Sequence, residues 1–250
     1  MKNIILTLSI FFLSFSLLGQ SDPMEVLMQD PEFTPAMQYL MSGDYESCVK
    51  FLDAFDSSHK NYYSIVMLKA QCNWELRDYS ELKKDVEILL SSTEKDDPNY
   101  ADLVNLYGLS LKNTGEIKRS KSVFQEGYET TKNQMLLLNL IQLYNDSQQY
   151  KKSVAYENAL ETDSFGILHF FIGEAFFELG DFDKAEVYLL KYVEKIGNEL
   201  KFQSYFMLGK IEKEKGNMTK SCESFVEANK SFAMMSEEMI SLNEEYTQLS

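Results

Sequence analysis

Residues 172–185 read IGEAFFELGDFDKA, and this stretch decides how the rest of the chain is interpreted. Its apolar residues up to Leu179 recur at helical spacing. Gly180 follows, and glycine is the residue that most readily adopts the positive φ on which helices commonly end. A large apolar residue, Phe182, stands two positions after the turn. The stretch therefore predicts two helices joined by a tight turn.

Similar turn signals recur along the chain. They fall at six residues: Gly43, Arg77, Gly115, Gln148, Gly180 and Gly216. The intervals between them are 34, 38, 33, 32 and 36 residues. A period near 34 is typical of helical-repeat proteins, in which each helix pair stacks on the next. We therefore expect about six helix-turn-helix units.

Fixed offsets from each turn carry the same kind of side chain, which supports this register. Seven residues before the turns stand Ala36, Ala70, Gly108, Ile141, Gly173 and Gly209. Five residues after them stand Cys48, Leu82, Ser120, Ser153, Ala185 and Ser221. Where one of the two is large, as in Leu82 or Ile141, its counterpart is small. This compensation indicates that the two positions meet where the antiparallel helices cross.

Over about residues 29–233 the chain resembles the tetratricopeptide-repeat family. The best local matches are Asp97-Pro98-Asn99-Tyr100 leading into Leu106-Tyr107-Gly108, and the stretch quoted above. One departure is Glu157, which occupies a usually apolar position. The resemblance implies an all-α fold, a right-handed α-solenoid of about six such repeats with a C-terminal capping helix.

The N-terminus predicts export. Lys2 precedes an uncharged apolar run from Ile4 to Leu18, and residues 19–21 are small or polar. At about 15 residues this run is short for a membrane span, which needs roughly 20, so it is read as a signal peptide. An uncleaved anchor is the alternative. No later segment reaches spanning length, and a periplasmic or secreted location follows.

The expected organisation has four parts. Residues 1–20 form the signal peptide, 21–33 a lead-in segment, 34–233 the repeat domain and 234–250 the capping helix. The last assignment rests on Met239, Leu242, Tyr246 and Leu249, whose spacing is amphipathic. A terminal element of this kind seals the last repeat of a solenoid.

Composition and motifs argue against several functions. With 24 basic and 39 acidic residues, the formal charge of −15 disfavours nucleic acid. Neither His59 nor His169 belongs to a catalytic motif, and the cysteines lack metal-ligand spacing. We therefore expect no enzyme activity, cofactor or metal. Cys48 and Cys72 are interpreted as small core residues, with a disulfide between them as the alternative.

The resemblance implies a protein or peptide partner bound in the concave groove of the solenoid. This groove would be lined by residues ten, six and three before each turn, which share one face of each first helix; we call them the first-helix wall. They are Phe33, Met37, Leu40, Met67, Gln71, Trp74, Asn105, Leu109, Lys112, Leu138, Gln142, Asn145, Phe170, Glu174, Phe177, Phe206, Lys210 and Lys213. The residues expected to contact the partner are Met67, Gln71, Trp74, Asn105, Lys112, Leu138, Gln142, Asn145, Phe170, Phe177 and Lys210.

Two readings of function remain open. The first is a non-catalytic interaction scaffold that uses this groove. The alternative is a structural subunit of a cell-envelope or secretion assembly, held through its convex face or C-terminal helix. The sequence does not define the oligomeric state.

Overall fold

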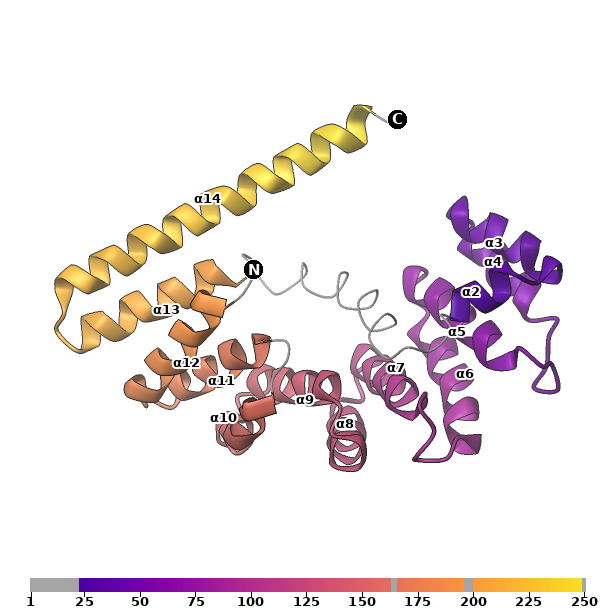
Figure 1. Cartoon of the computed structure of the whole chain (residues 1–250), viewed down its shortest axis with the longest axis horizontal. Helices are drawn as coiled ribbons and strands as arrows, with labels where there is room; N and C mark the ends of the chain where they lie inside the picture. The colour runs from indigo at the N-terminus through magenta and orange to yellow at the C-terminus, as the bar shows by residue number, and fades with distance from the viewer. Residues whose placement is uncertain (1–22, 163–165, 196–199, 249–250) are drawn as a thin grey trace. The chain divides into compact units, whose positions relative to one another are not determined.

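The computed structural model describes residues 23–162, 166–195 and 200–248 (Figure 1). The expected signal peptide, residues 1–20, lies outside these ranges. The described chain is all-α, as predicted, and it divides into two compact units. Unit 1 ends at Leu136 and unit 2 begins at Leu137.

Unit 1 holds the first three helix pairs. Its helices are α2 (Pro23–Met28), the 3-10 helix η1 (Pro31–Phe33), α3 (Thr34–Met41), α4 (Tyr45–Leu52), α5 (Tyr62–Glu75), α6 (Tyr79–Ser92), α7 (Tyr100–Asn113) and α8 (Ile117–Thr131). The pairs α3/α4, α5/α6 and α7/α8 pack together, and each pair also packs on the next through α4/α5 and α6/α7. The lead-in segment is therefore helical in part.

Unit 2 holds the last three pairs. After α9 (Gln134–Asp146), which begins in unit 1, come α10 (Tyr150–Val154), the 3-10 helix η2 (Glu157–Thr162), α11 (Ile167–Glu178), α12 (Phe182–Lys195), α13 (Lys201–Glu214) and α14 (Met218–Gln248). α11 packs on α12 and α13 on α14, while α12 also packs on α13.

The six predicted turn residues all have positive φ. The angles are 73° at Gly43, 58° at Arg77, 84° at Gly115, 55° at Gln148, 79° at Gly180 and 80° at Gly216. At each turn the next amide donates back to the helix that has just ended, as Asp181 N does to Phe176 O over 3.0 Å. The Asp181 carboxylate then accepts from Lys184 N and begins the second helix. All six residues thus have the backbone conformation that ends a helix, even where the residue is not glycine.

The small contact positions are buried where the paired helices cross. The Ser120 hydroxyl donates to the carbonyl of Gly108 over 2.7 Å, and the Ser221 hydroxyl to that of Gly209 over 2.8 Å. A side chain reaches the facing backbone in this way because the facing residue is small. The repeat offsets read from the sequence therefore mark true contacts.

Repeat four has an unusually short second helix. α10 ends at Val154 and a 3-10 helix replaces the following turns. Glu157, the departure from the family pattern, accepts hydrogen bonds from Lys184 Nζ (2.8 Å) and Tyr188 Oη (2.7 Å) of α12. At a position that is usually apolar in the family, this carboxylate thus links η2 to α12 through hydrogen bonds.

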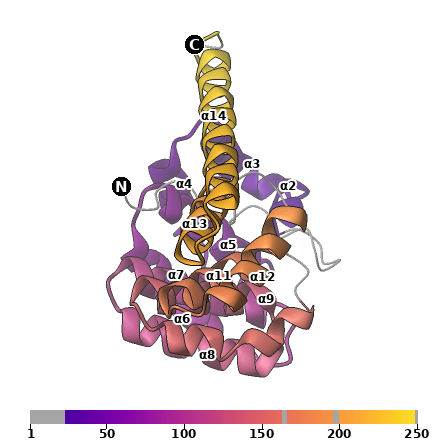
Figure 2. The same cartoon turned by 90° about the vertical axis from the view of Figure 1, so that its left-hand side faces the viewer.

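The C-terminal helix differs from the expected boundary at residue 234. α14 runs without interruption from Met218 to Gln248, over 31 residues (Figure 2). No glycine or proline occurs in this range, so nothing in the backbone ends the second helix of repeat six before the expected cap begins. The two predicted elements are one helix. Within the described ranges, no helix has both the length and the apolar content to cross a membrane.

Candidate functional site

In unit 1 some of the predicted contact residues of the first-helix wall are buried in the core and are not accessible to a partner. Met67 and Asn105 are buried, and Met67 belongs to the cluster between α5, α6 and α7. Gln71, Trp74 and Lys112 are half-buried. The Trp74 ring packs edge-on against Tyr79, 5.3 Å away between centroids, so the indole is held in place while part of it faces solvent. Three of the five predicted residues here are accessible.

In unit 2 the predicted residues on α9 are mostly internal. Leu138 is buried, whereas Gln142 is half-buried. Asn145 is buried and its amide makes three hydrogen bonds: Nδ2 donates to Phe171 O (2.8 Å) and to Glu174 Oε2 (2.9 Å), and Oδ1 accepts from Ser153 Oγ (2.6 Å). Asn145 therefore joins α9 to α11 and has little capacity left for a partner.

The wall residues on α11 differ in burial. Phe170 is buried against Tyr192, with ring centroids 5.6 Å apart. Glu174, one turn further along, is half-buried, and burial raises the pKa of its carboxyl above the ordinary value although Asn145 donates to it. Phe177 is half-buried and packs on Phe182 across the turn.

The open part of the unit 2 wall lies on α11 and α13. Phe206 is 41% exposed, which is unusual for phenylalanine. The Lys210 ammonium lies 4.9 Å from the Phe206 ring centroid and 5.8 Å from that of Phe177. Lys213, one turn beyond Lys210, is exposed as well. The structure thus brings together Phe177, Phe206 and Lys210 from two consecutive first helices.

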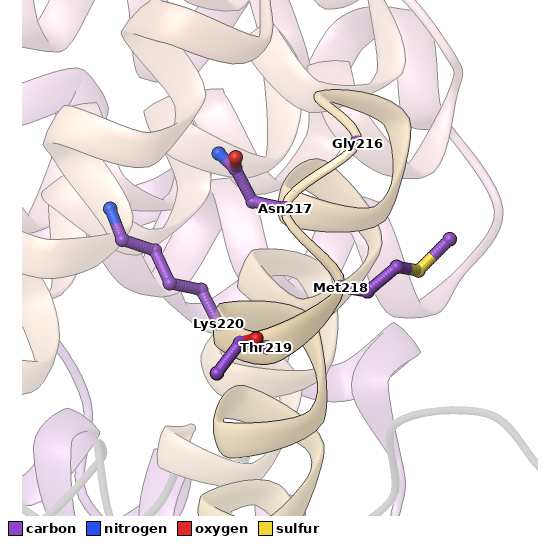
Figure 3. Close-up of a pocket in the computed structure, with 5 residues that line it drawn as sticks. All are labelled: Gly216, Asn217, Met218, Thr219 and Lys220. Carbon is purple, nitrogen blue, oxygen red and sulfur yellow. The ribbon is translucent and has the colours of Figure 1, made fainter.

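A shallow depression of about 410 Å³ lies at the turn between α13 and α14 (Figure 3). It is lined by Gly216, Asn217, Met218, Thr219 and Lys220, all exposed residues of one segment. The side chains of Asn217 and Lys220 point to one side of the turn and Met218 to the other. Sequence reasoning did not single out this depression, which has no enclosing walls from other elements.

Metal ions require a ligand set of several His, Cys, Asp or Glu side chains close together. In the part of the chain that the structure describes, no group of three or more His, Cys, Asp or Glu side chains could hold a metal ion. His169 is buried, with its ring 6.0 Å from that of Tyr188, as expected for a packed histidine. The fold and this surface define an all-α helical-repeat protein.

The particular repeat follows from comparison with known families. The tetratricopeptide-repeat family model matches residues 168–194 and 202–231, the two helix pairs α11/α12 and α13/α14. The chain therefore contains tetratricopeptide repeats at these two helix pairs, in agreement with the turns expected at Gly180 and Gly216. Members of the family are generally non-catalytic scaffolds that bind protein partners.

Solved structures support the fold across more of the chain. The C-terminal part of a TPR repeat-containing protein from Cytophaga hutchinsonii is 15% identical, with a TM-score of 0.63 over 80% of this chain and 79% of that one. MamA from Desulfovibrio magneticus RS-1 is 15% identical, with a TM-score of 0.58 over 69% of this chain and 96% of that one. Comparison with curated proteins gives no match.

Proposed function

We propose that this protein is an interaction scaffold whose unit 2 wall binds an extended segment of a partner protein, with Phe177, Phe206 and Lys210 as the main contacts. The observation that supports this most is the exposed Phe206 ring beneath the Lys210 ammonium. Aromatic side chains that a partner can cover are common anchors of protein–protein interfaces. Export from the cytoplasm is part of the proposal.

The packing around this cluster favours binding without large rearrangement. Phe206 is held from below by Phe225 of α14, with centroids 5.7 Å apart, and by Phe202 at 6.1 Å. Phe177 is held by Phe182. Because these rings are already fixed, little side-chain entropy would be lost when a partner covers them.

The charge of the cluster suggests the chemistry of the partner. Lys210 and Lys213 are exposed on α13 in a chain with a net charge of −15. A lysine ammonium has three N–H donors, so one that lies over a ring can still donate to a carboxylate. We therefore expect the bound segment to place an apolar side chain over Phe206 and a carboxylate beside the lysines.

Burial divides the eleven predicted contact residues into two groups. We propose that the accessible ones touch a partner; they are Gln71, Trp74 and Lys112 in unit 1 and Gln142, Phe177 and Lys210 in unit 2. The buried ones hold the first helices in place; they are Met67, Asn105, Leu138, Asn145 and Phe170.

Site-specific photo-crosslinking tests the proposal. A photo-reactive phenylalanine analogue would replace Phe206 in one variant and Val187, a 49% exposed residue of α12, in the other. In cells of the source organism, we expect a defined partner adduct at position 206 and none at 187. A second substitution, Lys210→Glu, should reduce the adduct at position 206. Adducts at 187 alone would contradict binding on the wall.

A second candidate function is favoured by apolar residues on second helices. Val187 of α12 and Met218, Val226 and Met234 of α14 are each about half exposed or more, at 49%, 59%, 53% and 59%. A subunit of an envelope or secretion assembly could be held through such residues. Deletion of 234–250 would then abolish assembly, whereas Phe206→Ala would leave it unchanged.

A further inference from the structure

Two cysteines from neighbouring repeats meet in the core of unit 1. Cys48 lies in α4, five residues after the first turn, and Cys72 lies in α5, five residues before the second. Both are fully buried in the same hydrophobic cluster, and neither is bonded to another cysteine. The two thiols lie close enough to shift each other's pKa. The pair therefore lies at the interface where α4 packs on α5.

The surroundings of the pair fix its geometry. Cys48 Sγ also lies 3.5 Å from the carbonyl oxygen of Ala36, which places the thiol between α3 and α5. Phe33, Leu52, Ile65 and Leu68 belong to the cluster around both cysteines. The two thiols thus lie in one buried cluster on two helices that pack together, and a disulfide between them requires only that the sulfur atoms approach directly.

We propose that Cys48 and Cys72 are a disulfide site that links α4 to α5. The bond would close a loop over residues 49–71, which includes the connection between the first and second repeats. Such a bond stabilises mainly by restricting the unfolded chain. It would fix the first repeat, which packs on the second through α4 and α5.

The reaction needs an oxidant that is itself a disulfide, such as a thiol–disulfide oxidoreductase or oxidised glutathione. The Cys48 thiolate attacks one oxidant sulfur, and the other sulfur leaves as a thiolate. Cys72 then loses its proton and attacks Cys48 Sγ, which releases the second oxidant thiolate. Two protein thiols are oxidised, two electrons reduce the oxidant, and the two protons pass to the leaving thiolates.

The two thiols influence each other's pKa in the folded chain. Contact with Cys72 holds the pKa of Cys48 below its ordinary value, whereas the same contact, together with burial, raises the pKa of Cys72. A thiolate is the form of cysteine that attacks a disulfide. Because both sulfurs are buried, the oxidant reaches them during folding or local opening of the first repeat.

Thiol mapping of the purified full chain tests the proposal. The chain is incubated with oxidised glutathione, then unfolded, alkylated and digested. We expect a peptide pair linked through Cys48 and Cys72, with a mass lower by two hydrogens, and no bond from either to Cys222. The outcome that overturns the proposal is recovery of unlinked Cys48 and Cys72 after Cys222, which is exposed, has reacted.

A melting experiment separates a native bond from an accidental one. The control is the double variant Cys48→Ala and Cys72→Ala, since alanine occupies the same register positions in repeat five as Ala185 and Ala175. We expect a reductant to lower the Tm of the oxidised protein by several degrees and to leave that of the variant unchanged. A bond that forms only in denaturant, or that lowers the Tm, contradicts the proposal.

Discussion

Repeat three, α7 with α8, and repeat five, α11 with α12, have glycine at the same position but use it differently. At Gly108 an added Cβ would lie 2.4 Å from Phe124 Cε1, so a phenyl ring fills the space over the bare backbone. At Gly173 it would lie 3.0 Å from Leu189 Cγ and 3.3 Å from Leu189 N, so the second helix itself comes close. A glycine in the first helix thus accommodates either a large ring from the second helix, as in repeat three, or a close approach of the second helix itself, as in repeat five.

The two repeats differ also in charge. Thirteen residues before the turn, repeat three has Asp102 and repeat five has Ile167. Burial raises the pKa of Asp102 from the ordinary 3.8 to about 6, and its charge contributes to a raised pKa of Tyr63. Repeat three therefore contains a carboxyl whose ionisation opposes folding, and repeat five has no counterpart at that position.

The largest expected effect is in repeat five. Gly173→Leu should lower the free energy of unfolding by about 3 kcal/mol or more, the upper end of the range for overpacked cores. The reason is that the backbone of Leu189 limits how far the two helices can move apart. Urea denaturation measures it. Glu178→Leu, at an exposed position of the same helix, is the control and should have little effect. Equal stability of both variants would mean that the register is wrong.

The next effect concerns Asp102. Its pKa is higher in the folded than in the unfolded chain, so the folded state binds more protons between about pH 4 and 6 and stability falls as pH rises through this window. Allowing for the partial exposure of the carboxyl, the loss above pH 6 should be about 2 kcal/mol. Asp102→Asn should therefore be more stable than the natural chain at pH 7 and equal to it at pH 4. Urea titrations of both proteins at both pH values check this, and a constant difference would contradict it.

A smaller effect separates the two glycine environments. Gly108→Ala should destabilise by about 1–2 kcal/mol, because the Phe124 ring must move from its fully buried place. Gly173→Ala should be close to neutral, since the Leu189 side chain and its backbone nitrogen need to move by only a few tenths of an ångström and alanine favours the helix by about 0.5–1 kcal/mol, which offsets that shift. Thermal unfolding compares the two variants, and a larger loss in Gly173→Ala would reverse the comparison.

The turns were predictable because several signals coincide there. Arg77 and Gln148 have no glycine signal, yet the repeat period and the flanking offsets place them in the turn, and both adopt positive φ. The end of α14 was not predictable in the same way. The sequence between its two halves has no helix-breaking residue, and amphipathic spacing alone cannot show whether one helix or two is present.

The exposure of the wall could not be derived from spacing. Met67, Phe170 and Phe206 all stand ten residues before their turns, but Met67 and Phe170 are buried whereas Phe206 is 41% exposed. The register fixes which face of a helix a residue occupies. It does not fix how much of that face the adjacent helices cover. Burial therefore had to come from the structure.

The smallest expected effect returns to the helix crossing. Ser120 in repeat three and Ala185 in repeat five stand five residues after their turns, but only Ser120 has a hydroxyl, which donates to Gly108 O over 2.7 Å. Ser120→Ala makes repeat three resemble repeat five and should cost about 1 kcal/mol, the net value of one buried hydrogen bond. Urea denaturation of this variant beside Ser221→Ala, which loses the equivalent bond to Gly209, measures it. If neither substitution changes stability, the hydroxyl contributes nothing and small size alone determines the residue at this position.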